Sequence, residues 1–157
     1  MSEEAGPAHG SSLNRLAFAA TWHCLSGCAI GETLGMVVAT AFGWGDVASI
    51  AIAAVLAFLF GYALTLRPLL RARVSLGEAA RVAVAADSVS IAVMEIVDNG
   101  FLLVVPGALE AGLTNLLFWW SLAVSLAIAF VAAFPVNRAL IARGRGHAVA
   151  HRHHPDH

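Results

Sequence analysis

The sequence predicts an all-α integral membrane protein, folded as a four-helix bundle with both termini in the cytoplasm. Of its 157 residues, 59% are hydrophobic and only 12% are charged, and the mean hydropathy is +0.79. These values are too apolar for an ordinary soluble domain. Four apolar runs are each long enough to cross a hydrocarbon core, which takes about 20 helical residues. Short connections between the runs favour one up-down bundle.

The predicted elements follow one another along the chain. Residues 1–15 are polar and rich in Gly, Pro and Ser, so we expect a flexible arm there. The apolar run after this arm is too long for a signal-peptide core, so we expect it to be retained. The transmembrane domain covers residues 16–142, with helices at about 16–42, 46–66, 79–105 and 113–134, and an Arg/His-rich tail covers 143–157.

The distribution of basic residues predicts the orientation. Up-down topology puts the nine basic residues, which are all arginines, on one side: Arg15, Arg67, Arg71, Arg73, Arg81, Arg138, Arg143, Arg145 and Arg152. The two opposite loops contain none. The positive-inside rule therefore predicts a multi-pass protein with cytoplasmic termini. The absence of lysine beside abundant Ala, Val and Arg suggests a bacterial genome, so we expect the inner membrane of a bacterium. Because the arginines are explained as topology anchors, we expect the lipid bilayer as partner and no nucleic acid.

The first apolar run carries polar side chains at depth, in the stretch TWHCLSGCAIGETLG (21–35). At about 1.5 Å per residue, Cys28 lies roughly 18 Å into the helix. A helical projection puts Cys24, Cys28 and Glu32 on one face, with His23 at its edge. The same face holds three glycines at four-residue spacing: Gly27, Gly31 and Gly35.

The third apolar run has acidic residues at matching depth. Asp87, Met94 and Asp98 fall along one line of this helix, and Glu95 flanks it. An acidic side chain at mid-membrane costs about 2.5–3.5 kcal/mol, so these groups must be paired, hydrated or bound to a cation. We therefore predict that Glu32 joins the three acids of the third helix in an ion or proton relay between the two helices.

The glycine ridge predicts close helix packing. Small residues at this spacing let another helix approach closely. The simplest arrangement sets the ridge against the polar face of the third helix, and the alternative is a dimer seam. A homodimer is expected, because four short helices enclose only a narrow path. The other candidate seam is the alanine-rich second helix, with Ala48, Ala51 and Ala54.

The kinds of ligand atom on these two helices predict a metal site. Thiolate, imidazole and thioether are ligands of soft or borderline metals, Cu(I) and Zn(II) above all. Cys24 and Cys28 are one turn apart and could touch one ion, with His23 or Met94 as a further ligand. A disulfide between adjacent turns would strain the helix, so metal binding ranks above thiol exchange.

The tail offers a second, weaker metal site. His147 and His151 are one helical turn apart in a His-rich tract, and such tracts are prone to bind metal. A solvated basic tail held to anionic headgroups is the alternative.

Three sequence patterns carry a resemblance: Thr-Trp-His-Cys-x-x-Gly-Cys-x-x-Gly-Glu (21–32), Phe-Trp-x-Ser-x-x-x-Ser (118–125), and Pro-Val-Asn-Arg (135–138) followed by Arg-Gly-His-x-x-x-His (145–151). The chain resembles an uncharacterised family of small bacterial membrane proteins, catalogued as a domain of unknown function. The resemblance covers residues 20 to 154 and implies a four-helix membrane fold. It implies no activity.

Three functions remain open. The favoured one is a membrane protein that binds and transports a transition-metal ion, preferably copper, between the first and third helices. The second is a proton-coupled carrier of small solutes in which the buried acids act and the cysteines only pack. The third is a structural or accessory subunit whose polar groups fix helix register. No nucleotide-binding or catalytic motif is present, so an enzyme is not expected.

Overall fold

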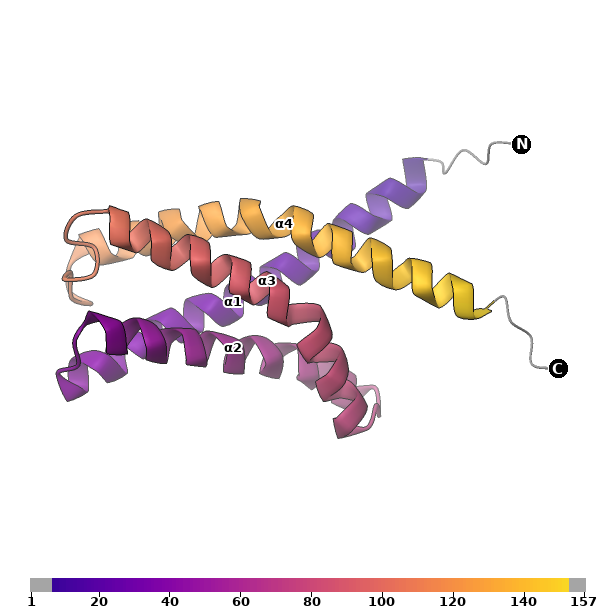
Figure 1. Cartoon of the computed structure of the whole chain (residues 1–157), viewed down its shortest axis with the longest axis horizontal. Coiled ribbons are helices and arrows are strands. Elements are labelled where there is room, and N and C mark those ends of the chain that lie inside the picture. Colours follow the sequence, from indigo (N-terminus) through magenta and orange to yellow (C-terminus); the bar gives the residue numbers. More distant parts are fainter. Residues whose placement is uncertain (1–6, 153–157) are drawn as a thin grey trace.

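The computed structural model in Figure 1 describes the backbone of residues 7–152 and the side chains of residues 10–144. This part of the chain forms four helices and no strand: α1 (Pro7–Phe42), α2 (Asp46–Arg71), α3 (Leu76–Val104) and α4 (Leu116–Arg152). The prediction of an all-α, four-helix chain is therefore confirmed.

Three of the helices are long and apolar enough to cross a membrane. They are α1 from Gly10, α2 over its whole length, and α4 as far as Gly144. α3 has 29 residues, a sufficient length, but its apolar run is interrupted by acidic side chains. The composition and the helices together identify a membrane protein, in which α3 is the polar member of the bundle.

Each helix extends beyond one of its predicted bounds, whereas α3 ends at Val104 and α4 begins at Leu116, just inside the other bound. α1 begins at Pro7 rather than at residue 16, because proline suits the first turn of a helix, where its missing N–H would have no partner. α2 passes through Pro68, and α4 passes through Pro135, although we expected the last helix to end at about residue 134. In a membrane helix, neighbouring groups compensate for the hydrogen bond that proline removes.

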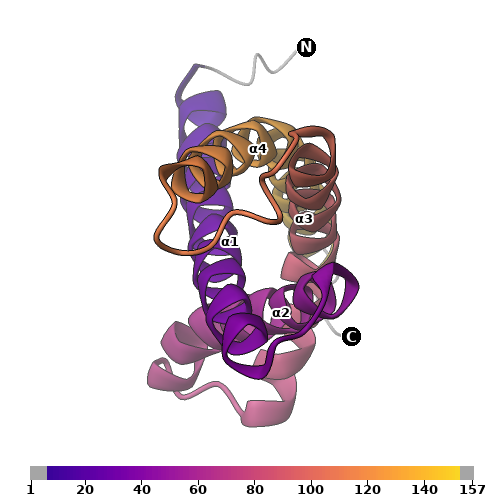
Figure 2. The ribbon, with the colours of Figure 1, turned by 90° about the vertical axis from the view of Figure 1, so that its left-hand side faces the viewer.

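α1 and α3 face each other diagonally across the bundle. Viewed from one end, the four helices surround a common centre, with α2 and α4 between the diagonal pair (Figure 2). At one end of the molecule, which we call the termini end, α1 begins, α4 ends and the chain turns from α2 into α3 (Figure 1). The α1–α2 turn and the loop of residues 105–115 close the opposite end, the loop end.

The glycine ridge of α1 packs against α2, which corrects both predicted partners. Gly35 faces Ala53 and Gly31 faces Ala57, while a Cβ on Gly27 would lie 2.7 Å from the Cα of Gly61. The ridge therefore contacts α2 rather than α3, and α2 covers the face that a dimer seam at these glycines would need. Close approach to α2 leaves the rest of the polar face, with the cysteines and Glu32, directed toward the centre and α3.

Small side chains and sulfur fill the middle of the bundle. The buried cluster there contains Cys24, Cys28, Ala57, Ile91, Met94, Ala129 and Ala133. Large apolar side chains point outward instead, among them Ile96 at 73% and Val131 at 72% exposed. Each helix thus has an apolar outer face suited to lipid and an inner face of small or polar side chains.

Candidate functional site

The inner faces of α1 and α3 bring buried polar groups into successive layers. Nearest the termini end, the Cys24 thiol donates to Asp87, with the sulfur 3.8 Å from Oδ1. Both residues are buried. The second carboxylate oxygen of Asp87 has no hydrogen-bond partner, and neither has the buried hydroxyl of Ser90, one turn further along α3.

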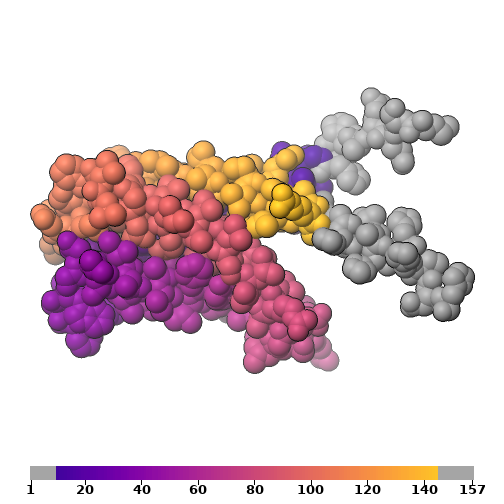
Figure 3. All heavy atoms as spheres, viewed as in Figure 1, coloured from indigo at the N-terminus to yellow at the C-terminus, as the bar shows by residue number. Residues whose placement is uncertain are grey.

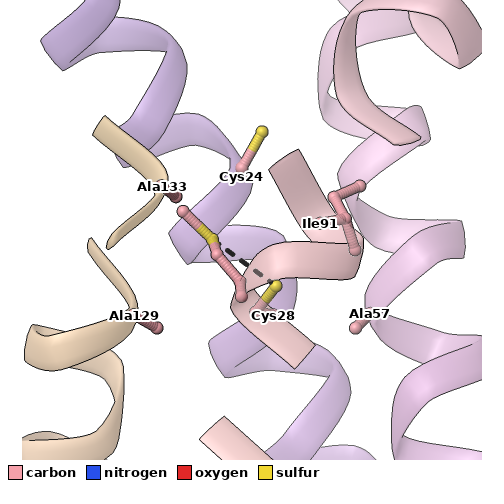
Figure 4. Packing of buried hydrophobic residues seen from close by; sticks show 7 residues of the cluster. Cys24, Cys28, Ala57, Ile91, Ala129 and Ala133 are labelled. Atoms are coloured by element: carbon pink, nitrogen blue, oxygen red, sulfur yellow. Dashed lines mark hydrogen bonds between the residues drawn. The ribbon is translucent and has the colours of Figure 1, made fainter. Parts of the chain in front are cut away.

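Two sulfur atoms form the next layer. The Cys28 thiol on α1 contacts the Met94 thioether on α3, with 3.9 Å between Sγ and Sδ (Figure 4). Cys28 is 1% exposed and Met94 is fully buried, so no solvent reaches either sulfur. Ala129 and Ala133 of α4 and Ala57 of α2 surround the pair with methyl groups. The centre of the bundle thus holds two soft donors in an apolar shell.

Three carboxyl groups form the layer nearer the loop end. Asn99 donates to Glu95, with Nδ2 3.2 Å from Oε2, and Ser125 of α4 donates to Oδ1 of Asp98. Glu32 of α1 interacts with both Asp98 and Glu95. One oxygen of each of the three carboxyl groups is buried without a partner. An unpartnered buried polar group costs about 1–3 kcal/mol, so the layer has unused capacity to bind a proton or a cation.

The predicted metal ligands are only partly brought together. Cys24 and Cys28 each face a partner on α3, Asp87 for Cys24 and Met94 for Cys28. His23 points elsewhere: its Nε2 lies 3.1 Å from the carbonyl oxygen of Leu64 on α2, and its side chain is exposed. Among the residues that the structure describes, no three His, Cys, Asp or Glu side chains are grouped to hold a metal ion.

The weaker predicted metal site, in the tail, concerns His147 and His151. His147 and His151 belong to the last part of α4, but their side chains lie outside the described residues.

Access to the polar layers differs between the two ends. At the termini end, cavities of about 390 and 410 Å³ both reach Asp87. At the loop end, a cavity of about 20 Å³ touches Glu32 and Asn99 and is closed in by side chains such as Phe118. The smaller space is close to the volume that one water molecule needs. The cavities that reach the polar layers are therefore larger toward the termini than toward the loop end.

Several polar partners were not recognised as site residues from the sequence. Ser125 binds Asp98, and Asn137 of α4 donates to Thr21 of α1 over 2.9 Å, with both members of this pair buried. The available signal was the Ser-x-x-x-Ser spacing at residues 121–125, together with an asparagine just after Pro135. Small hydroxyl and amide groups commonly join helices inside membranes.

These observations define a class: an all-helical membrane protein with a buried polar interior between two of its four helices. The family model for the domain of unknown function DUF4396 matches residues 14–146, and the chain belongs to this family. Comparison with curated proteins gave no match, and comparison with solved structures gave none either.

Proposed function

We propose that this membrane protein binds a soft transition-metal cation, with copper(I) as the favoured cargo, and passes it between α1 and α3. The contact between Cys28 and Met94 carries this proposal, because it joins a thiol and a thioether from facing helices, 3.9 Å apart, at the buried centre. Thiolate and thioether together favour Cu(I) over the harder divalent ions. The proposed metal centre uses these two sulfur atoms as ligands and does not include His23.

The neighbouring layers provide further ligand atoms, a proton acceptor and negative charge for such a cation as it moves. Cys24 and Asp87 offer a thiol and an unpartnered carboxylate oxygen on the side of the open cavities. Metal binding to a cysteine requires the thiolate, so a proton must leave. Glu95 lies within electrostatic range of Cys28 and has an unpartnered oxygen that can accept this proton. The acids nearer the loop end then compensate the charge of the departing cation.

Metal content tests this proposal directly. Full-length protein is purified in detergent with all tail histidines replaced by alanine, so that only an intramembrane site can hold metal. Elemental mass spectrometry after loading with Cu(I) is compared between this background and the same background carrying Cys24→Ser and Cys28→Ser. We expect near-stoichiometric copper that disappears with the cysteines, with Ser26→Ala as the matched control that retains it. Equal trace metal in all three proteins would contradict the proposal.

A second candidate is a proton-coupled carrier of small solutes. The unpartnered oxygens of Glu32, Asp87, Glu95 and Asp98 favour it, because buried acidic groups in membrane helices commonly relay protons. Transport by this route would survive replacement of both cysteines by serine, whereas metal transport would not. Proton uptake by proteoliposomes containing the double cysteine variant separates the two candidates.

The same proposal includes an orientation. The arginines cluster at the termini end, so the positive-inside rule puts this end, and its open cavities, in the cytoplasm of a bacterial cell. A homodimer remains part of the proposal. Because the glycine ridge is occupied by α2, the exposed Ala48 and Ala51 of α2 are the seam residues that stay available.

A further inference from the structure

We propose that the open end of the bundle is a binding site for a small amphipathic organic cation, with Asp87 as its counter-ion. The two cavities of about 390 and 410 Å³ share walls formed by Ala20, Val82, Ala86, Asp87 and Ile141. We call the two cavities together the vestibule. Volumes of this size fall in the range of pockets that hold small organic ligands.

Helix splay creates the vestibule. α2 and α3 bend away from the start of α1 and the end of α4, and Figure 3 shows a notch between the α2–α3 turn and the last described residues of α4. All four helices contribute to the vestibule walls at this end, including Leu69 of α2 and Leu140 of α4. A ligand can therefore reach the vestibule from the termini end without passing the loop end.

The vestibule has apolar walls and one unsatisfied charged group. The other polar side chains of its lining are Asn137, which donates to Thr21, His23, whose ring contacts the Leu64 carbonyl, and Thr65. Asp87 is only 7% exposed, and its Oδ2 has no hydrogen-bond partner. The vestibule thus presents one acidic side chain on a mainly apolar surface.

This combination selects the chemical class of the ligand. A hard inorganic cation needs six or more oxygen ligands, which these apolar walls do not provide. An uncharged molecule would leave the carboxylate unpaired, and an anion would be repelled by it. A monocation carried on an apolar body both pairs with Asp87 and covers the alanine, valine and leucine side chains, as ligands in concave apolar sites do.

The inference stands independently of the proposed metal cargo, because it uses neither sulfur of the central pair. It does connect to that function, since Asp87 also contacts Cys24. A bound organic cation would stand between the cytoplasmic solvent and the first thiol. Absence of copper binding would therefore leave this inference untouched, and absence of cation binding would leave the metal proposal untouched.

Tetraphenylphosphonium, a permanent cation with an apolar body, is the probe. Its free concentration is measured with an ion-selective electrode over full-length protein in phosphatidylcholine nanodiscs, and binding to empty nanodiscs is subtracted. Asp87→Asn keeps the shape and removes the charge. Ala86→Phe keeps the charge and fills a wall that both cavities share. Glu110→Gln, on the exposed loop, is the matched control.

We expect saturable binding to the wild-type protein and to Glu110→Gln, with affinity lowered about tenfold or more by either vestibule variant, equivalent to at least about 1.4 kcal/mol. Circular dichroism and size-exclusion profiles verify that each variant is folded. If Asp87→Asn does not fold, Ala86→Phe decides the outcome. Unchanged affinity in a folded vestibule variant overturns the inference. So does the lack of saturable binding above empty nanodiscs, the result expected if lipid acyl chains fill the vestibule.

Discussion

Ser125 on α4 donates a hydrogen bond to Asp98 on α3, and both side chains are buried at no more than 1% exposure. This bond joins two helices inside the part of the bundle where charge is least tolerated. The second oxygen of Asp98 has no hydrogen-bond partner. Without the neutral hydroxyl of Ser125, the first oxygen would also lose the hydrogen bond that it accepts.

Replacement of Ser125 by alanine should lower the free energy of unfolding by about 1–3 kcal/mol, the cost of an unsatisfied buried polar group. Ser121→Ala is the control, because Ser121 is buried on the same helix one turn earlier. Denaturant unfolding in detergent, followed by circular dichroism, measures the difference. Equal losses in the two variants would show that packing of the hydroxyl matters more than its bond to Asp98.

Met94→Leu should weaken Cu(I) binding while it preserves the fold. Leucine is close to methionine in volume, so the change typically costs less than 1.5 kcal/mol of stability. It removes one of the two sulfurs at the centre, and we expect at least about a tenfold loss of affinity, since 1.4 kcal/mol corresponds to a factor of ten. Competition with a chromogenic Cu(I) chelator measures the affinity.

Met36→Leu is the control for this experiment. Met36 lines the small cavity at the loop end and is not part of the sulfur pair. If both variants bind Cu(I) as the unaltered protein does, the thioether is a packing group only.

Gly31→Ala should destabilise the bundle by about 1–3 kcal/mol through overpacking. A methyl group at this position would overlap the backbone of Ala57, and backbone cannot turn aside as a flexible side chain can. Gly100→Ala in α3 is the matched control, because no atom lies within 4 Å of the Cβ position there. In this control, alanine should be neutral or slightly stabilising, since glycine costs a helix about 0.5–1 kcal/mol. Thermal unfolding of both variants in the same detergent provides the comparison.

Glu95→Gln tests whether Glu95 serves ion movement or only the structure of the bundle. The glutamine keeps an oxygen that can accept from Asn99 and removes a buried acidic group with an unpartnered oxygen. If Glu95 serves ion movement, we expect equal or higher thermal stability together with lost transport, as is common when active groups are neutralised. A clear loss of stability or of assembly would instead support the accessory-subunit hypothesis, in which the acids fix helix register.

Hydrophobic periodicity was sufficient to predict four helices, and the projection of residues 21–35 correctly separated an inner from an outer face. The partner of the glycine ridge could not be predicted, because α2 offers Ala53, Ala57 and Gly61 as its own small-residue ridge, and sequence spacing does not say which helix is adjacent. The sequence placed Cys28 and Met94 at similar depth, and the structure brings their two sulfur atoms to 3.9 Å from each other. The direction of the His23 side chain could not be predicted. His23 lies at the edge of the polar face of α1, where a carbonyl oxygen on α2 is within its reach.

The acids of α3 have a consequence for how the protein is made. With Asp87, Glu95 and Asp98 on its inner face, α3 is the one helix of the four that does not meet the apolarity needed to span a membrane by itself. Partition of such a segment into lipid is unfavourable until other helices cover its acidic face. We therefore predict that α3 stays at the insertion machinery until α4 emerges and supplies Ser125. Ribosome-bound chains that end before α4 should leave α3 accessible to aqueous labels, and longer chains should protect it.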